Sequence, residues 1–317
     1  MEGTRAGQRA GIMSVDAAQL RSGKGSGDEN FPVASWVVAP QHRRPILAFY
    51  EFVRIADDIS DHASLAPEDK LKHLDSLEGS LVGRNTDNPA GVTLRAALAE
   101  RNLTPQHALD LLHAFRQDVT KLRYKDWDDL IDYCRYSAMP VGRYVLDVHG
   151  ENRATWAASD NVCAVLQIIN HLQDCVKDLR NLDRVYIPLD AMAAAGTDIE
   201  ALKALRSTPQ MLACLHGLAD RTADMLEQGS RLPGEIADRR LSLEIAAIVH
   251  LARHFVRLLR TRDPLCENVR LGKLGVAGIG LLGAAKGFLG RALFSRPAHA
   301  PGAVSRSSAD ERRQHPH

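Results

Sequence analysis

The feature that most constrains this chain is a helical spacing of apolar residues along nearly its whole length. Apolar side chains return at intervals of three and four positions within residues 46–56, 109–115, 162–169, 211–226 and 243–255, which is the repeat of one face of an amphipathic helix. No run of alternating β-branched residues bounded by turn pairs interrupts this pattern, so strands are not predicted. The spacing therefore predicts an all-α protein of about ten helices in a single domain.

Prolines and glycines divide the pattern into separate helices. Helix stops are predicted at Pro40, Pro105, Pro188, Pro209 and Pro233, with C-terminal breaks at Gly83, Gly150 and Gly196. The segment from Asn152 to Arg180 contains neither residue type, and one helix of about 25 residues is predicted there.

The ends of the chain and its composition bear on location and partners. Residues 1–29 lack the apolar stretch of a signal peptide, residues 296–317 are equally polar, and both are expected to be disordered around a folded domain of residues 30–295. No stretch approaches the ~20 apolar residues of a membrane span. Five cysteines without a CxxC pair indicate reduced thiols, so a cytoplasmic protein is expected. With 40 basic and 39 acidic residues, the net charge of +1 gives no general attraction to nucleic acid.

The first group of chemically interesting residues is acidic and lies at the end of an apolar helical segment. Arg54, Asp57, Asp58 and Asp61 fall within about 100° of one another on a helix. Asp57 and Asp61 are i,i+4 neighbours, and such a like-charge pair is destabilising unless a cation lies between them.

A second polar stripe follows on the long predicted helix. Gln167, Asn170, Asp174 and Asp178 stay within about 80° of one another, while the other faces are largely apolar. Burying amides and carboxylates is costly unless something satisfies them, and oxygen ligands completed by water and phosphate suit Mg²⁺. Two facing aspartate pairs could hold Mg²⁺ around a diphosphate, which would help it to leave and generate a carbocation.

The aspartate spacing alone does not identify a metal site. Asp128 and Asp132 have the same DxxxD spacing and are interpreted as a solvated helix start. The apolar helical setting, the presence of two pairs and the added amides favour the metal interpretation for the other two groups.

Four segments, in this order, resemble the squalene/phytoene synthase family. They are AFYEFVRIADDISD at 48–61, the Tyr133-Cys134 and Val141-Gly142 pairs, QIINHLQDCVKD at 167–178, and the R-x-Y-x-P segment at 184–188. The resemblance implies an isoprenoid-synthase-type helical bundle around a central apolar cavity. It also implies that Mg²⁺ and diphosphate are held by Asp57, Asp61, Asn170, Asp174 and Asp178, whose four aspartates are the catalytic candidates. The residues expected to line the phosphate end of the substrate cavity are Arg54, Tyr133 and Gln167.

Two short segments resemble one branch of that family. Residues 29–35 (ENFPVAS) and 137–143 (SAMPVGR) look like the bacterial hydroxysqualene synthase branch, associated with hopanoid biosynthesis. That branch converts presqualene diphosphate and water into hydroxysqualene and diphosphate. Gln173, where many members have Arg, and Asp183, where Gly is common, depart from the general pattern. Two alternatives stay open, a head-to-head prenyl transferase acting on two prenyl diphosphates and a catalytically silent helical scaffold.

Several other patterns are given structural interpretations. Residues 278–283 match GxGxxG but lack a surrounding βαβ unit, so no nicotinamide cofactor is expected. The apolar run 274–285 is either a Gly-rich packing helix or a shallow interfacial anchor that gives peripheral membrane contact. The residues interpreted as ordinary helix histidines and cavity-filling thiols are His250, His254, Cys134 and Cys175.

Overall fold

The computed structural model describes residues 39–270, and within this range the predicted all-α fold is confirmed. Apart from one isolated bridge between Arg123 and Val185, the regular structure of this part is helical. The α-helices are α1 (Pro40–Ser60), α2 (Pro67–Val82), α3 (Pro89–Glu100), α4 (Gln106–Thr120), α5 (Trp127–Ser137), α6 (Met139–His149), α7 (Trp156–Leu182), α8 (Leu189–Ala194), α9 (Pro209–Gly229), α10 (Leu232–Glu235) and α11 (Arg239–Leu259). Two 3₁₀ helices, η1 (Arg153–Thr155) and η2 (Ile199–Lys203), complete them.

The prolines predicted to stop helices instead mark helix starts, so this part of the prediction is wrong. Pro40 and Pro209 begin α1 and α9, Pro105 and Pro188 are the N-caps of α4 and α8, and Pro233 lies in the first turn of α10. The reason is that the first amide groups of a helix have no partner within it, so proline loses nothing there.

The predicted glycine breaks and the predicted long helix agree with the structure. Gly83 and Gly150 end α2 and α6 with φ values of 84° and 71°, a left-handed conformation that favours glycine. Gly196, with φ of 71°, follows α8. The long helix is α7, which has 27 residues, ends at Leu182 and is capped by Asp183.

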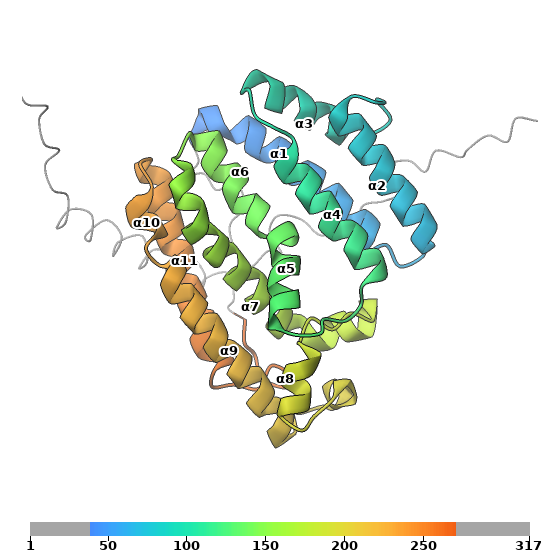
Figure 1. Cartoon of the computed structure of the whole chain (residues 1–317), viewed down its shortest axis with the longest axis vertical. Coiled ribbons are helices and arrows are strands. Elements are labelled where there is room, and N and C mark those ends of the chain that lie inside the picture. The colour runs from blue at the N-terminus through green and yellow to red at the C-terminus, as the bar shows by residue number, and fades with distance from the viewer. Residues whose placement is uncertain (1–38, 271–317) are drawn as a thin grey trace, which may run out of the picture.

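Two clusters of buried apolar side chains hold the helices together. One unites α1 to α4, and the other is built mainly from α5, α7, α9 and α11. Helix α6 belongs to both, because Tyr144 and Val148 join the first cluster and Met139 and Leu146 join the second. Figure 1 shows the same order in space, with α2 and α3 on one side of the molecule and α10 and α11 on the other.

Close packing of α6 explains the Val-Gly pair recognised in the sequence. A Cβ atom at Gly142 would lie 2.4 Å from Ser159 Oγ and 2.5 Å from Cys163 Sγ, both on α7. On its other side, α6 meets α1, where the rings of Tyr144 and Phe49 stack with centroids 3.9 Å apart. Only a residue without a side chain allows α6 and α7 to approach this closely.

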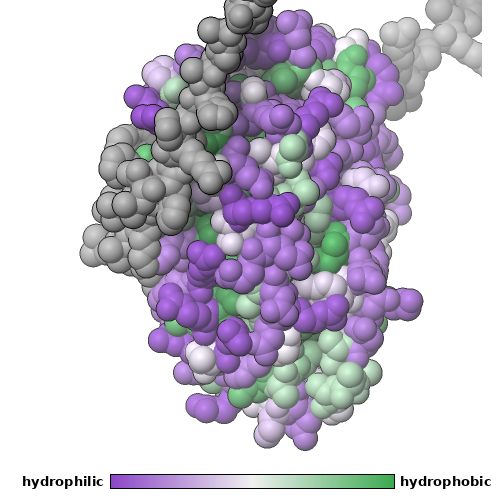
Figure 2. All heavy atoms as spheres, turned by 60° about the vertical axis from the view of Figure 1, so that its left-hand side comes forward, coloured by the Kyte–Doolittle hydropathy of each residue, from purple (hydrophilic) through white to green (hydrophobic). Residues whose placement is uncertain are grey.

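The surface of the described region is mainly polar. On the face drawn in Figure 2, hydrophilic residues predominate and hydrophobic ones are scattered in small groups. None of the helices in the described range is long and apolar enough to cross a membrane. The predictions for residues 1–29, 29–35, 274–285, 278–283 and 296–317 lie outside the described residues.

Candidate active site

The first acidic group lies at the C-terminal end of α1, with an arginine one turn before it. Arg54 contacts Asp57 Oδ2 at 3.2 Å and Asp58 Oδ1 at 3.1 Å. Asp58 is buried, whereas Asp57 and Asp61 are only partly covered. Asp61 caps the C-terminus of the helix. Arg54 therefore balances Asp57 and Asp58, whereas Asp61, the i,i+4 neighbour of Asp57, needs a cation from outside α1.

The second acidic group forms a half-buried stripe on α7. Gln167, Asn170, Asp174 and Asp178 are each partly exposed. Four apolar residues between them, Ile168, Ile169, Leu172 and Cys175, are buried in the larger apolar cluster, whereas Lys177 is exposed. The stripe is thus a polar edge on a helix whose remaining faces pack largely in the core, as the sequence predicts.

Arg184, placed just after α7, connects the two halves of the protein. Its guanidinium donates to Asp61 Oδ1 at 2.6 Å and to the backbone carbonyl oxygens of Ser60 and Asp118 at 3.3 and 3.0 Å. The side chain is almost completely buried. Its neighbours Asp118, Tyr186 and Asp61 outweigh burial and raise the pKa of Arg184, so it remains a cation. The end of α1 is therefore tied to the segment that leaves α7.

Asp118 on α4 is a polar residue of this region that the sequence analysis missed. Its side chain is 6% exposed and accepts hydrogen bonds from the hydroxyls of Tyr133 at 2.9 Å and Tyr186 at 3.2 Å. Burial raises the pKa of Asp118 to about 6 against the opposing effects of Arg184 and the two hydroxyls. No periodic pattern in the sequence connects Asp118 with its partners, which come from α5 and from the segment after α7.

The same network reaches the second acidic stripe through aromatic rings. The rings of Tyr186 and His171 stack with centroids 3.5 Å apart, and His171 Nδ1 lies 4.0 Å from Asp178 Oδ2. Burial lowers the pKa of His171 and raises the pKa of both Tyr133 and Tyr186 well above the ordinary value. A continuous set of contacts thus joins Asp61 on α1 to Asp178 on α7.

The R-x-Y spacing follows from the extended path of residues 184–188. The Val185 amide donates to the Leu122 carbonyl at 2.9 Å, so this segment lies against the connection between α4 and α5. Alternate side chains of an extended segment point the same way, and Arg184 and Tyr186 both reach Asp118. Tyr133 also faces Asp118, and its hydroxyl is buried within the network rather than at its edge.

The two departures from the family pattern have structural partners. Gln173 is buried and donates to the Val269 carbonyl at 2.8 Å, and the next residue, Arg270, forms an ion pair with Asp174. Asp183 adopts a positive φ of 51° and contacts Arg123 at 2.6 Å. A cation near the second stripe is therefore supplied by Arg270 in place of the arginine common at position 173.

The predicted metal ligands have the chemistry that a divalent cation preferring oxygen requires. They offer carboxylate and amide oxygens on partly covered side chains, which a metal can reach from one side. Three of the four aspartates pair with an arginine, and the fourth, Asp178, lies 4.0 Å from the imidazole of His171. The arginine pairs are Asp57 with Arg54, Asp61 with Arg184 and Asp174 with Arg270.

The acidic, cysteine and histidine residues that were not predicted to take part in catalysis have environments that agree with that prediction. Asp128 and Asp132 are exposed on α5, as interpreted, and Asp132 pairs with Arg135 at 3.6 Å. Burial raises the pKa of Cys134 and Cys175 to about 12, so both remain thiols. His254 is half-buried on α11, and among the described residues neither it nor its neighbour one turn earlier belongs to a group of three metal-binding side chains.

Comparison with known proteins gives consistent matches. The family model described as squalene/phytoene synthase matches residues 25–274. A hydroxysqualene synthase of Rhodopseudomonas palustris is 60% identical over 81% of this chain and 88% of its own length. A second, from Sinorhizobium fredii, is 57% identical over 78% and 85%. The crystal structure of squalene synthase HpnC from Alicyclobacillus acidocaldarius matches with a TM-score of 0.62 and 30% identity over 86% of this chain and 93% of that one.

Proposed function

The chain belongs to the squalene/phytoene synthase family of enzymes, and within that family we propose that it is a hydroxysqualene synthase. In the proposed reaction, the carbon–oxygen bond to diphosphate in presqualene diphosphate breaks, the resulting carbocation rearranges, and water adds to it with loss of a proton. Hydroxysqualene and diphosphate are the products. The two relatives at 60% and 57% identity, both named hydroxysqualene synthase, support this choice of branch.

The metal in this proposal is Mg²⁺. The residues that would hold it with the diphosphate are Asp57, Asp61, Asn170, Asp174 and Asp178. When bound, the metal would neutralise the departing diphosphate and so lower the barrier to its release. Arg54 and Gln167, which lie on the same helices, would contact the phosphate end of the substrate.

Other residues of the chain would position these groups. Arg184 holds Asp61 in place, and Asp118 in turn fixes Tyr133 and Tyr186. Because both phenols have pKa values well above the ordinary one, they stay protonated and act as hydrogen-bond donors rather than as bases. Tyr133 is thus proposed as a positioning residue beside the phosphate end. An apolar cavity would hold the isoprenoid chains and limit the access of water to the cation.

The observation that carries the proposal is the unbroken set of contacts between the two acidic motifs. A silent scaffold has no need of two acidic motifs linked through a buried arginine, a buried aspartate and a buried tyrosine, since such groups are costly to bury. A head-to-head prenyl transferase would use the same motifs, so only the substrate distinguishes it from a hydroxysqualene synthase.

The test supplies purified protein with either presqualene diphosphate or farnesyl diphosphate, with Mg²⁺ and without nicotinamide. We expect hydroxysqualene from presqualene diphosphate, with one ¹⁸O atom incorporated from labelled water, and no turnover in excess chelator. A C30 product from farnesyl diphosphate alone would establish the prenyl transferase alternative. Inactivity towards both substrates in a folded protein would favour the scaffold.

Variants then test the motifs themselves. Asp57→Asn and Asp174→Asn should each lower turnover by about 10³-fold, because each removes a charge that the reaction depends on. Asp132→Asn is the matched control, since Asp132 has the same DxxxD spacing but lies on α5, outside both acidic groups. Full activity in either of the first two variants would contradict the metal-binding assignment.

The location and boundaries of the protein are also proposals. We propose a cytoplasmic enzyme with a folded region of residues 30–295 and peripheral membrane contact through the apolar run 274–285, whose flanking lysines and arginine favour a lipid surface. Sedimentation with anionic lipid vesicles, compared between the full chain and a Leu281→Asp variant, tests the contact. Equal sedimentation of both would contradict it.

A further inference from the structure

Three side chains from three helices converge at the end of the molecule opposite the acidic motifs. His42 lies in the first turn of α1, His149 is the last residue of α6, and Asp238 is the N-cap of α11. One possible ligand atom from each lies within 4.8 Å of the other two. The two imidazole rings are 4.2 Å apart between centroids.

In His149 and in Asp238, one polar side-chain atom forms hydrogen bonds with the backbone and the other is available to a ligand. His149 Nδ1 lies 2.8 Å from the Val145 carbonyl oxygen, so it carries the proton and donates it. Nε2 then has a free lone pair, which is the arrangement usual for a metal-binding histidine. Asp238 Oδ1 accepts from the amides of Arg240 and Leu241 at 2.8 and 2.9 Å, which leaves Oδ2 for another partner.

His42 contributes an unsatisfied nitrogen. Its side chain is 7% exposed, and its Nδ1 has no hydrogen-bond partner among the described residues. Nε2 lies 3.2 Å from the side-chain amide of Gln41, an exposed residue. When that amide turns so that its oxygen accepts from Nε2–H, Nδ1 carries the lone pair that a metal needs. Leaving a buried polar atom unpaired is costly and calls for an explanation such as a bound ion.

The types of ligand atom in the cluster indicate which metal it would hold. A neutral imidazole is the form that binds metal. Two imidazole nitrogens and one carboxylate oxygen suit zinc and related first-row divalent ions, whereas Mg²⁺ prefers oxygen ligands alone. The nearby guanidinium of Arg101 is exposed, so water screens its repulsion of a cation.

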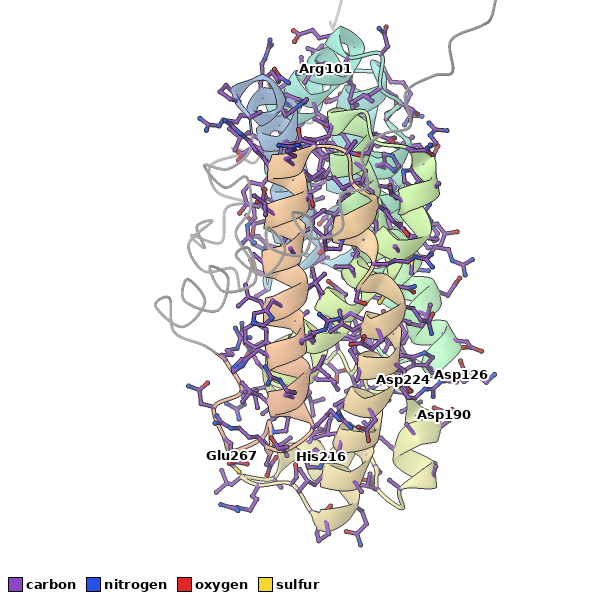
Figure 3. The ribbon with its side chains drawn as sticks, turned by 90° about the vertical axis from the view of Figure 1, so that its left-hand side faces the viewer. Arg101, Asp126, Asp190, His216, Asp224 and Glu267 are labelled. Atoms are coloured by element: carbon purple, nitrogen blue, oxygen red, sulfur yellow. The ribbon has the colours of Figure 1, made fainter. Side chains whose placement is uncertain are left out.

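This cluster is distinct from the proposed active site. His42 and Asp57 are fifteen residues apart on α1, which corresponds to about 22 Å along the helix axis. Figure 3 places Arg101, whose guanidinium bonds to the Gln41 carbonyl, at the end of the molecule where α11 begins, far from His216 and Glu267 at the other end.

We propose that His42, His149 and Asp238 form a structural site for a first-row divalent metal ion, with zinc as the expected occupant and water as the fourth ligand. The ion would join the start of α1, which belongs to the first apolar cluster, to the start of α11, which belongs to the second. Glu151 already fixes the approach to α11, because its carboxylate accepts from the amides of Ala237 and Asp238 at 2.8 and 2.7 Å.

The test titrates the chelator-treated full chain with Zn²⁺ in the presence of excess Mg²⁺, which occupies oxygen sites elsewhere. We expect one equivalent of zinc to remain after gel filtration, measured by elemental analysis. At a hundredfold excess over Kd, zinc should raise the Tm by about 5–10 °C. Cobalt in its place should give the visible absorption of a four-coordinate site with nitrogen and oxygen ligands.

Asp238→Asn is the decisive variant, because asparagine can still cap α11 but provides only a weak neutral ligand. It should retain the Tm of the metal-free protein within a few degrees while losing the zinc-dependent rise and at least tenfold in zinc affinity. His149→Gln should behave in the same way. His254→Gln, which changes a half-buried histidine outside the cluster, and Asp174→Asn should keep the full equivalent.

Two results would overturn the proposal. One is zinc binding by Asp238→Asn with the affinity of the unaltered protein, and the other is loss of the bound equivalent in Asp174→Asn, which would move the ion to the acidic motifs. The absence of any retained zinc in the unaltered chain would also refute it. All three measurements are independent of turnover, so they leave the proposed reaction to its own test.

Discussion

Replacing Asp118 by asparagine tests whether burial or ion pairing has the larger effect on the pKa of this residue. Burial favours the neutral acid, whereas Arg184 and the hydroxyls of Tyr133 and Tyr186 favour the carboxylate. Burial prevails and raises the pKa of Asp118 from 3.8 to about 6. Asparagine has nearly the same volume and can still form hydrogen bonds with both tyrosines, so the change removes little except the titrating charge.

The raised pKa fixes the sign of the pH dependence. Between pH 3.8, the pKa in the unfolded chain, and about 6, the pKa in the folded protein, Asp118 binds more protons in the folded state. The contribution of Asp118 to the free energy of unfolding is therefore largest at low pH and is lost as the pH rises through about 6. The full difference between 3.8 and about 6 corresponds to about 3 kcal/mol. Between pH 4.5 and pH 7.5 the expected loss is about 2 kcal/mol.

Urea unfolding followed by circular dichroism measures this effect when both proteins are compared at each pH. Other titrating groups cancel in the difference between the unaltered chain and Asp118→Asn, so that difference should fall by about 2 kcal/mol from pH 4.5 to pH 7.5. Asp132→Asn, which removes an exposed carboxylate outside the network, is the control with which that fall is compared. A flat or rising difference for Asp118→Asn would mean that Arg184 keeps the carboxylate ionised throughout, and the argument from burial would fail.

Three further changes have outcomes that the packing determines. Gly142→Ala forces a methyl group into the α6–α7 contact and should lower the free energy of unfolding by about 1–3 kcal/mol, measured by urea denaturation; an unchanged midpoint would contradict the close approach. Asp183→Gly should be more stable than Asp183→Ala by about 1 kcal/mol, because both lose the exposed ion pair but only glycine accepts the positive φ without strain. Arg184→Lys should lower turnover of presqualene diphosphate by about 10–100-fold with helical content intact, since lysine cannot replace the planar fork that holds Asp61; equal turnover would remove Arg184 from the positioning role.

The helices were predictable because their periodicity is local, and so was the polar stripe on α7. The two ends of a helix were harder to distinguish. Proline is disfavoured in a helix interior, although Pro45 lies inside α1, and it is favoured in the first turn. The same residue type can therefore end one helix and begin the next. At Pro40 and Pro209 the structure shows starts, and the sequence pattern alone favours neither interpretation.

The contacts that organise the site were not predictable from spacing. Asp118 and Arg184 are 66 positions apart, and nothing in the periodicity of either segment indicates that they meet. Arg184 and Tyr186 were identified only through a family resemblance, and Asp118 was missed because an acidic residue near the end of an amphipathic helix is ordinary on a surface. The same limit applies to the cluster of His42, His149 and Asp238, whose members come from three separate helices.

Helix α6 contributes side chains to both apolar clusters, and this affects how the protein unfolds. If this eleven-residue helix separates from one cluster, the side chains that it contributes to the other cluster also become exposed. Denaturation of the two regions should therefore be coupled, with one shared midpoint for a fluorophore attached near α2 and another attached near α9. Helix α4 makes a second link of this kind, because Ala114 joins the second cluster while Leu111 and Leu112 join the first. These two shared helices would then couple the unfolding of the described region.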